Sequence, residues 1–137
     1  MTSGFLEFVS LVKPRGKNRK YEEVFIVDCA NGVGAITLRN VLDQIQEKID
    51  PTLINIQVTK PQKLNVKCGP AYVQDEKMEP FEYQESMPDK VACISGDGDR
   101  LIYFKRSNTK IPTIIDGDKI FGFLMMYIVT LLEAIDL

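Results

Sequence analysis

The stretch VACISGDGDRLIYF, residues 91–104, carries the clearest structural signal in this chain. Its two ends, 91–94 and 101–104, are short and apolar, contain β-branched or aromatic residues and are bounded by turn residues, which is typical of strands. The six residues between them include Gly96 and Gly98, which let the backbone turn sharply. The stretch therefore predicts two strands joined by a tight, acidic loop.

The loop at 95–100 has the composition of a site for a metal ion and a phosphoryl group. Asp97 and Asp99 are two residues apart on a bent backbone, so their carboxylates converge, and hard carboxylate oxygens are the ligands that Mg²⁺ prefers. Arg100 follows directly, and a guanidinium is suited to a phosphate. A plain hairpin remains the alternative, because Asp-Gly and Gly-Asp pairs are ordinary turn residues.

A second segment, VFIVDCANGVGA at 24–35, is typical of a buried strand that runs through a glycine turn into a helix. A glycine-rich turn between strand and helix also suggests dinucleotide binding. However, Thr37 stands where the fingerprint requires its third Gly or Ala, which favours a plain strand-to-helix turn. The helix is expected over 35–45, because its apolar residues have the spacing of one helical face: Leu38, Val41, Leu42 and Ile45.

These segments together resemble the α-D-phosphohexomutase family, and two further pieces are similar to its phosphoacetylglucosamine mutase branch. The resemblance covers about residues 20–132. The matching pieces, in chain order, are 27–35 (VDCANGVGA), 63–65 (KLN) with 68–73 (CGPAYV), 96–100 (GDGDR) and 115–120 (IDGDKI).

The resemblance implies a four-domain enzyme, of which this chain matches only the second, metal-binding domain. Such an isomerase interconverts N-acetylglucosamine 6-phosphate and 1-phosphate through a phosphoserine in its first domain, on the route to UDP-N-acetylglucosamine. Mg²⁺ is held by three aspartates of the second-domain loop. Asp97 and Asp99 match two of these ligands, and Arg100 matches the catalytic arginine beside the phosphoserine. The implied partners are a hexosamine phosphate, bound by the complete enzyme, and the neighbouring domains.

Ser95 departs from the family pattern, because it occupies the position of the first aspartate. A hydroxyl can ligate Mg²⁺, as in nucleotide-binding loops, so the expected metal ligands are Ser95, Asp97 and Asp99. The site nevertheless loses one of three negative charges. Three interpretations stay open: a working site with a hydroxyl ligand, a non-catalytic binding module that keeps the fold, or a substitution introduced into the sequence.

The chain has 137 residues, enough for one domain with a core but not for four. We expect an amphipathic helix and a basic linker at 1–20, and an α/β domain at 21–137 with a small mixed β-sheet between helices in three layers. Further strands are expected at 54–59 and 111–115. A short helix is implied at 69–73 within an otherwise irregular 60–90. A final helix, capped by Asp116 or Asp118, is expected to pack on the sheet through 120–132 and to leave one face for a neighbouring domain.

Composition limits the function classes further. The net charge of −2 gives no positive field for nucleic acid, and the apolar run at 120–132 is too short to span a bilayer. The sequence contains no histidine, which excludes Ser-His-Asp catalysis and His-ligated zinc. Cys29, Cys68 and Cys93 lack metal-ligand spacing, and two of them lie in apolar strands, so reduced thiols and a cytoplasmic location are expected.

Overall fold

A computed structural model of the chain describes residues 24–45, 49–106 and 112–134. The predictions for residues 1–20 lie outside this range. The elements follow one another as β1 (Ile26–Asp28), α2 (Gly34–Ile45), β2 (Thr52–Ile54), η1 (Pro61–Lys63), α3 (Gly69–Glu76), β3 (Lys90–Ile94), β4 (Leu101–Lys105), β5 (Thr113–Ile115) and α4 (Gly117–Glu133).

The five strands form one mixed sheet in the order β2-β1-β3-β4-β5. Strand β1 pairs in parallel with β2 and with β3, whereas β4 and β5 are added antiparallel. Parallel neighbours require a crossover, which α2 supplies between β1 and β2. The predicted α/β fold with a small mixed sheet is confirmed.

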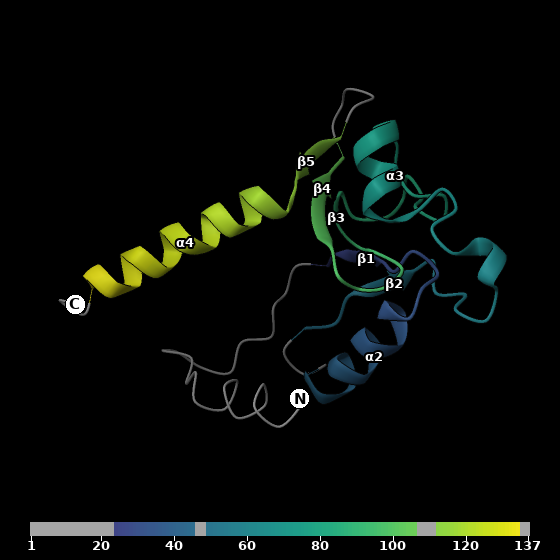
Figure 1. Cartoon of the computed structure of the whole chain (residues 1–137), viewed down its shortest axis with the longest axis horizontal. Coiled ribbons are helices and arrows are strands. Elements are labelled where there is room, and N and C mark those ends of the chain that lie inside the picture. Colours follow the sequence, from purple (N-terminus) through teal and green to yellow (C-terminus); the bar gives the residue numbers. More distant parts are fainter. Residues whose placement is uncertain (1–23, 46–48, 107–111, 135–137) are drawn as a thin grey trace.

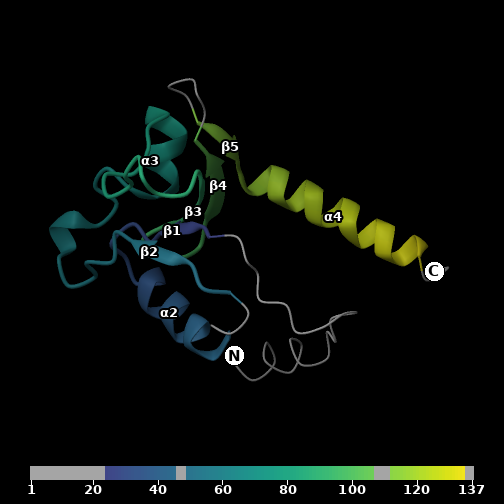
Figure 2. The same ribbon diagram turned by 180° about the vertical axis from the view of Figure 1, so that it is seen from behind.

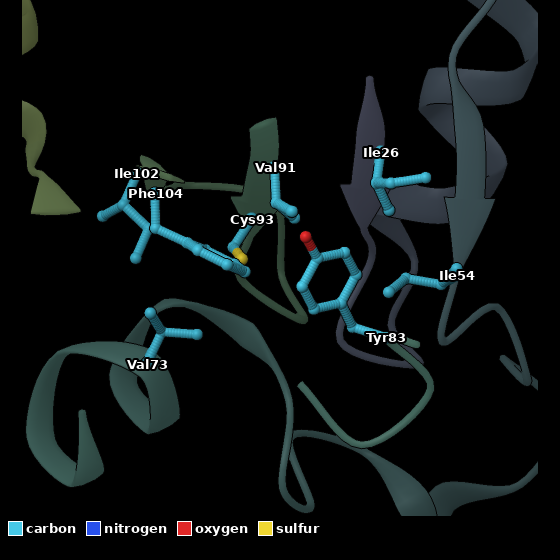
Figure 3. Packing of buried hydrophobic residues seen from close by; sticks show 8 residues of the cluster. All are labelled: Ile26, Ile54, Val73, Tyr83, Val91, Cys93, Ile102 and Phe104. Atoms are coloured by element: carbon cyan, nitrogen blue, oxygen red, sulfur yellow. The ribbon is translucent and has the colours of Figure 1, made fainter. Parts of the chain in front are cut away.

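The sheet is covered by helices on opposite faces, with α3 on one side and α2 on the other (Figure 1). On the α3 side of the sheet, buried side chains from strands β1 to β4 and from α3 meet around Tyr83 (Figure 3). The Tyr83 ring packs edge-on against Phe104 at a centroid distance of 5.7 Å. Towards α2, a smaller cluster joins Val27 and Ala92 of the strands to Ala35 of the helix. Buried and exposed residues alternate along β4, because successive side chains of a strand face opposite sides of the sheet.

The strand predicted at 54–59 is wrong. The structure places β2 at Thr52–Ile54, and the chain leaves the sheet at Asn55. Asn55 adopts a left-handed backbone with φ 51°, and its N–H donates to Glu82 Oε2 at 2.8 Å instead of to a strand. The alternating pattern beyond Ile54 is therefore a loop held by side-chain contacts.

Helix α4 begins as predicted, with Asp116 as its N-cap: the Lys119 N–H donates to Asp116 Oδ1 at 3.2 Å. The expectation that 120–132 packs on its own sheet is wrong. No residue of α4 is buried, and the helix projects away from the domain in both views (Figures 1 and 2). Among the described helices, none combines the length and the hydropathy needed to cross a membrane.

Candidate metal and phosphate site

The loop at 95–100 lies at the carboxyl end of β3, beside the loop that follows the parallel strand β1. The two loops touch at their glycines: a Cβ placed on Gly32 would overlap the backbone of Gly96. Asn65 joins them from a third segment, since its side-chain Oδ1 accepts from the Gly96 N–H at 3.2 Å and its own N–H donates to the Ala30 carbonyl at 3.0 Å. Three segments thus converge where such sheets bind ligands.

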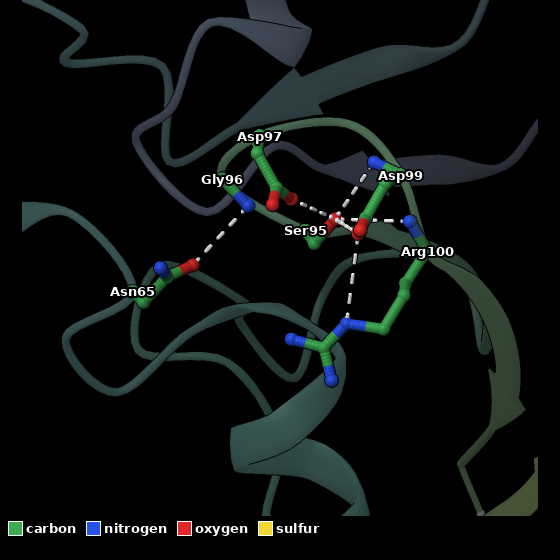
Figure 4. Close-up of polar contacts among 6 residues, drawn as sticks. All are labelled: Asn65, Ser95, Gly96, Asp97, Asp99 and Arg100. Atoms are coloured by element: carbon green, nitrogen blue, oxygen red, sulfur yellow. Dashed lines mark hydrogen bonds and ion pairs between the residues drawn. The ribbon is translucent and has the colours of Figure 1, made fainter.

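Ser95 is the centre of the loop, and its side chain is buried. Its hydroxyl oxygen accepts from the backbone N–H groups of Asp99, at 3.1 Å, and Arg100, at 3.0 Å. Its single proton is directed at two carboxylates, Asp97 Oδ1 at 2.7 Å and Asp99 Oδ1 at 3.0 Å (Figure 4). The hydroxyl therefore fixes the loop conformation and separates two like charges.

The charged groups of the loop are exposed, unlike Ser95. The hydrogen bond from the Ser95 hydroxyl lowers the pKa of Asp97 from its ordinary value, so this carboxyl is ionised at neutral pH. Arg100 extends past Asp99, with its Nε 3.7 Å from Asp99 Oδ1. At this separation and exposure the pair contributes little to stability, which leaves the guanidinium available to a ligand.

A cavity of about 440 Å³ opens beside the loop. Its wall combines the acidic loop and Arg100 with the glycine turn after β1 and the segment around η1; the lining residues are Asn31, Gly32, Val33, Val58, Pro61, Leu64, Asn65, Ser95, Gly96, Asp97 and Arg100. The volume is within the range of small-molecule sites. Three of the four predicted site residues, Ser95, Asp97 and Arg100, therefore line one concave surface, and Asp99 is not among its lining residues.

The side-chain oxygens fit a magnesium ion in spacing but only partly in bonding capacity. Ligand oxygens about 2.1 Å from Mg²⁺ in octahedral geometry stand about 3.0 Å from their neighbours, and the Ser95 oxygen lies 2.7 and 3.0 Å from the two carboxylate oxygens. Both lone pairs of that hydroxyl, however, already accept backbone N–H groups. Separately, no three His, Cys, Asp or Glu side chains within the described residues are placed to hold a metal together. Asp97 and Asp99 could therefore ligate the ion as they stand. Ser95 could ligate it only if its hydroxyl released one of the hydrogen bonds from the backbone N–H groups of Asp99 and Arg100.

Asp28 is a buried acid near the site that sequence reasoning did not single out. It is fully buried and accepts from the Ala30 N–H at 3.0 Å, the Asn55 Nδ2 at 2.8 Å and the Gly69 N–H at 2.6 Å. Burial raises the pKa of its carboxyl, and the three hydrogen bonds counteract that rise. Because Gly69 is the first residue of α3, Asp28 caps that helix from the end of β1. The Asp28 carboxylate therefore connects the end of β1 to Asn55 and to the start of α3, and so orders the loops around the cavity.

The three thiols surround Asp28 and are all free and buried. Burial raises the pKa of Cys29 and of Cys68 to about 12, and it raises that of Cys93 as well. Since the thiolate is the reactive form, we expect no reaction of the native protein with Ellman's reagent at pH 8, and release of all three equivalents in guanidinium chloride. A thiol that titrates rapidly in the native state would contradict this placement.

Known proteins resemble this chain in sequence and in fold. No protein-family model matches the chain. A crystal structure of an N-acetylglucosamine-phosphate mutase in the apo form, a member of the alpha-D-phosphohexomutase superfamily, matches with a TM-score of 0.77 at 27% identity and covers 96% of this chain and 27% of that one. Together with the sequence relatives below, this match shows that the chain belongs to the α-D-phosphohexomutase superfamily.

The branch within the superfamily follows from the sequence relatives. Phosphoacetylglucosamine mutase 1 of Schizosaccharomyces pombe is 31% identical over 130 residues, which cover 93% of this chain and 24% of the relative. The Aspergillus fumigatus N-acetylphosphoglucosamine mutase, solved with GlcNAc-6P and magnesium, matches with a TM-score of 0.65 at 32% identity and covers 74% of this chain and 21% of that one. The chain belongs to the phosphoacetylglucosamine mutase branch and spans about a quarter of the length of these relatives, consistent with a single domain.

Proposed function

We propose that this chain is the metal-binding domain of a phosphosugar mutase that interconverts N-acetylglucosamine 6-phosphate and 1-phosphate. The observation that carries the proposal is the grouping of the Ser95, Asp97 and Asp99 side-chain oxygens around one point, beside the exposed Arg100 guanidinium. The magnesium in the Aspergillus complex supports the same choice of ion. When bound, Mg²⁺ would neutralise charge on the phosphoryl group being transferred.

The residues of the 95–100 loop would have two roles, metal binding and phosphoryl binding. Asp97 and Asp99 would hold the ion, with the Ser95 hydroxyl as a neutral third ligand. Arg100 would orient a phosphoryl group, because a guanidinium offers a planar fork of donors to its oxygens. We assign the phosphoserine and the sugar-selecting groups to neighbouring domains. Catalysis therefore requires the complete enzyme, and we expect the isolated domain to be inactive. Free buried thiols agree with a cytoplasmic location for that enzyme.

A second candidate function is a non-catalytic binding module, and the bonding of Ser95 favours it. An aspartate carries two oxygens, of which one can accept backbone N–H groups while the other ligates a metal. The single oxygen of Ser95 already accepts two N–H groups. Backbone N–H groups therefore already use the acceptor sites of this oxygen, as we would expect in a domain that had lost the chemistry.

Manganese titration followed by electron paramagnetic resonance separates the two candidates. We expect wild type to bind Mn²⁺ with a Kd on the order of 10⁻⁴–10⁻³ M, typical of a site with few charged ligands, and Asp99→Asn to weaken binding about tenfold or more by removing a charge. Asp75→Asn, an exposed acid on α3, is the matched control and should bind as wild type does. Equal binding by all three proteins would reject the metal-binding domain in favour of the module.

A further inference from the structure

Asn65 is a polar residue beside the metal loop whose side chain is held in one orientation. Its backbone is left-handed, with φ 57°, a conformation that asparagine adopts more readily than most residues do. Its backbone N–H donates to the Ala30 carbonyl at 3.0 Å, and its side-chain Oδ1 accepts from the Gly96 N–H at 3.2 Å. These two hydrogen bonds fix the Asn65 amide relative to both loops of the site.

The hydrogen bond from Gly96 also decides which way round the Asn65 amide lies. The Gly96 N–H can donate only to the amide oxygen, because the amide nitrogen carries two N–H donors and no acceptor. In Figure 4 the oxygen accordingly faces the Gly96 nitrogen, and the Asn65 nitrogen lies on the other side of the amide. Asn65 is exposed, and no described residue accepts from its Nδ2. Two side-chain donors are therefore fixed in place and open to a ligand.

Gly96 is what allows the amide to lie so close to the metal loop. A Cβ on Gly96 would stand 2.9 Å from Asn65 Oδ1 and 3.1 Å from Asn65 Nδ2, and any larger side chain would displace the amide. Asn65 therefore reaches the loop at a glycine, next to Asp97.

Asn65 lines the same cavity of about 440 Å³ as Asp97 and Arg100. A phosphoryl group presents three oxygens that accept hydrogen bonds, and a guanidinium fork engages two of them. One oxygen is left for a further donor. A neutral amide suits that position, because a cationic side chain there would pair with the loop carboxylates and compete with the metal ion.

We propose that Asn65 is a phosphoryl-binding residue, whose Nδ2 donates to an oxygen of the phosphoryl group that Arg100 holds beside the metal loop. The proposal rests on the proposed function, because Arg100 and the metal loop define where that group lies. The hydrogen bonds to Ala30 and Gly96 hold the donor in place before the ligand arrives. Binding therefore costs little side-chain entropy.

Two substitutions of Asn65 remove the donors and suit the local backbone. Asn65→Asp keeps an oxygen for the Gly96 N–H but replaces the donors with a carboxylate oxygen, which repels a phosphate. Asn65→Gly removes the side chain, and glycine adopts the left-handed conformation without strain. Asn40→Asp is the matched control for the change of charge, because Asn40 is exposed on α2 and does not line the cavity.

Nuclear magnetic resonance of ¹⁵N-labelled protein, titrated with inorganic phosphate in millimolar Mg²⁺, tests the proposal. We expect saturable shifts of the Asn65 side-chain amide signals in wild type. Both Asn65 variants should raise the phosphate Kd at least about fivefold, as expected for the loss of a hydrogen bond to a charged group, and Asn40→Asp should leave it unchanged. Asn65→Asp should bind Mn²⁺ at least as tightly as wild type, because it adds a negative charge beside the loop. A merely structural role would weaken both ligands together.

The possible failures of this proposal and of the metal-binding function are distinguishable. Absence of Mn²⁺ binding by wild type would reject the metal-binding function and the role of Asn65 with it. Phosphate binding that is weakened by Arg100→Gln but not by either Asn65 variant would overturn the role of Asn65 alone. The same holds if wild type binds Mn²⁺ but no phosphate. If N-acetylglucosamine without phosphate shifts the Asn65 side-chain signals and phosphate does not, the amide contacts the sugar and the proposal is overturned.

Discussion

Replacing Asp28 with alanine is expected to lower the free energy of unfolding by about 3–5 kcal/mol. Three buried donors lose their acceptor at once, namely the N–H groups of Ala30 and Gly69 and the side-chain amide of Asn55. Each unsatisfied buried donor costs about 1–3 kcal/mol, and relief of the buried charge offsets part of the sum. Such a loss is a large share of the 5–15 kcal/mol that typically stabilises a domain.

Urea unfolding followed by circular dichroism measures this effect. Asp75→Ala provides the control, because Asp75 is an exposed acid on α3, and its removal should change stability by no more than about 0.5 kcal/mol. Similar midpoints for both variants would show that Asp28 does not hold the loops together.

The effect of Asp28→Ala also has a defined pH dependence. Burial raises the pKa of Asp28 above 3.8 in the folded protein, so the folded state holds this proton more tightly than the unfolded state does. The stability that arises from this difference is fully present below pH 3.8 and is lost as pH rises through the folded pKa. The difference in free energy of unfolding between wild type and Asp28→Ala should therefore be larger near pH 3.8 than at neutral pH. A difference that grows towards neutral pH would mean a lowered pKa.

Replacing Ser95 with aspartate is expected to tighten Mn²⁺ binding by at least about tenfold, the second large effect. The substitution restores the third negative charge of the family pattern next to a divalent cation, where Coulomb attraction amounts to several kcal/mol even at a high effective dielectric constant. It also supplies a second oxygen, so that one can accept the backbone N–H groups of Asp99 and Arg100 while the other faces the ion. Only the gain left after desolvation of the ligands is expected in the measured affinity.

Ser95→Asn separates charge from size. The amide has nearly the shape of the aspartate side chain but no charge, so it should not reproduce the gain in affinity. Both variants should be compared at equal fraction folded, because the site is buried at Ser95. If Ser95→Asp binds Mn²⁺ no more tightly than Ser95→Asn does, the loss of the first aspartate is not what weakens this site.

Local features of the fold could be predicted from the sequence. The strands on both sides of the 95–100 loop and the helix after the glycine turn follow from short-range patterns, and they match β3, β4 and α2. The grouping of Ser95, Asp97 and Asp99 was predictable for the same reason, because the three residues share one tight turn. Their roles as metal ligands stay predictions.

Features that depend on distant partners could not be predicted. The end of β2 at Ile54 depends on Glu82, which is 27 residues away from Asn55, and the role of Asp28 depends on Gly69, which is 41 residues away. No local pattern encodes either contact. The direction of α4 was predicted wrongly because an apolar helix indicates burial but does not indicate which surface covers it.

Nuclear magnetic resonance of ¹⁵N-labelled protein titrated with Mg²⁺ tests most directly whether the 95–100 loop is a divalent-cation site. We expect saturable shifts at millimolar Mg²⁺ in the backbone N–H signals of residues 95–100 and of the adjoining Asn65 and Gly32, with the remaining signals unchanged. The Asp99 and Arg100 signals should move most, because their N–H groups must share or release the Ser95 oxygen when it ligates the ion. Unchanged loop signals, or small shifts spread over all exposed acids, would contradict a metal site in this loop.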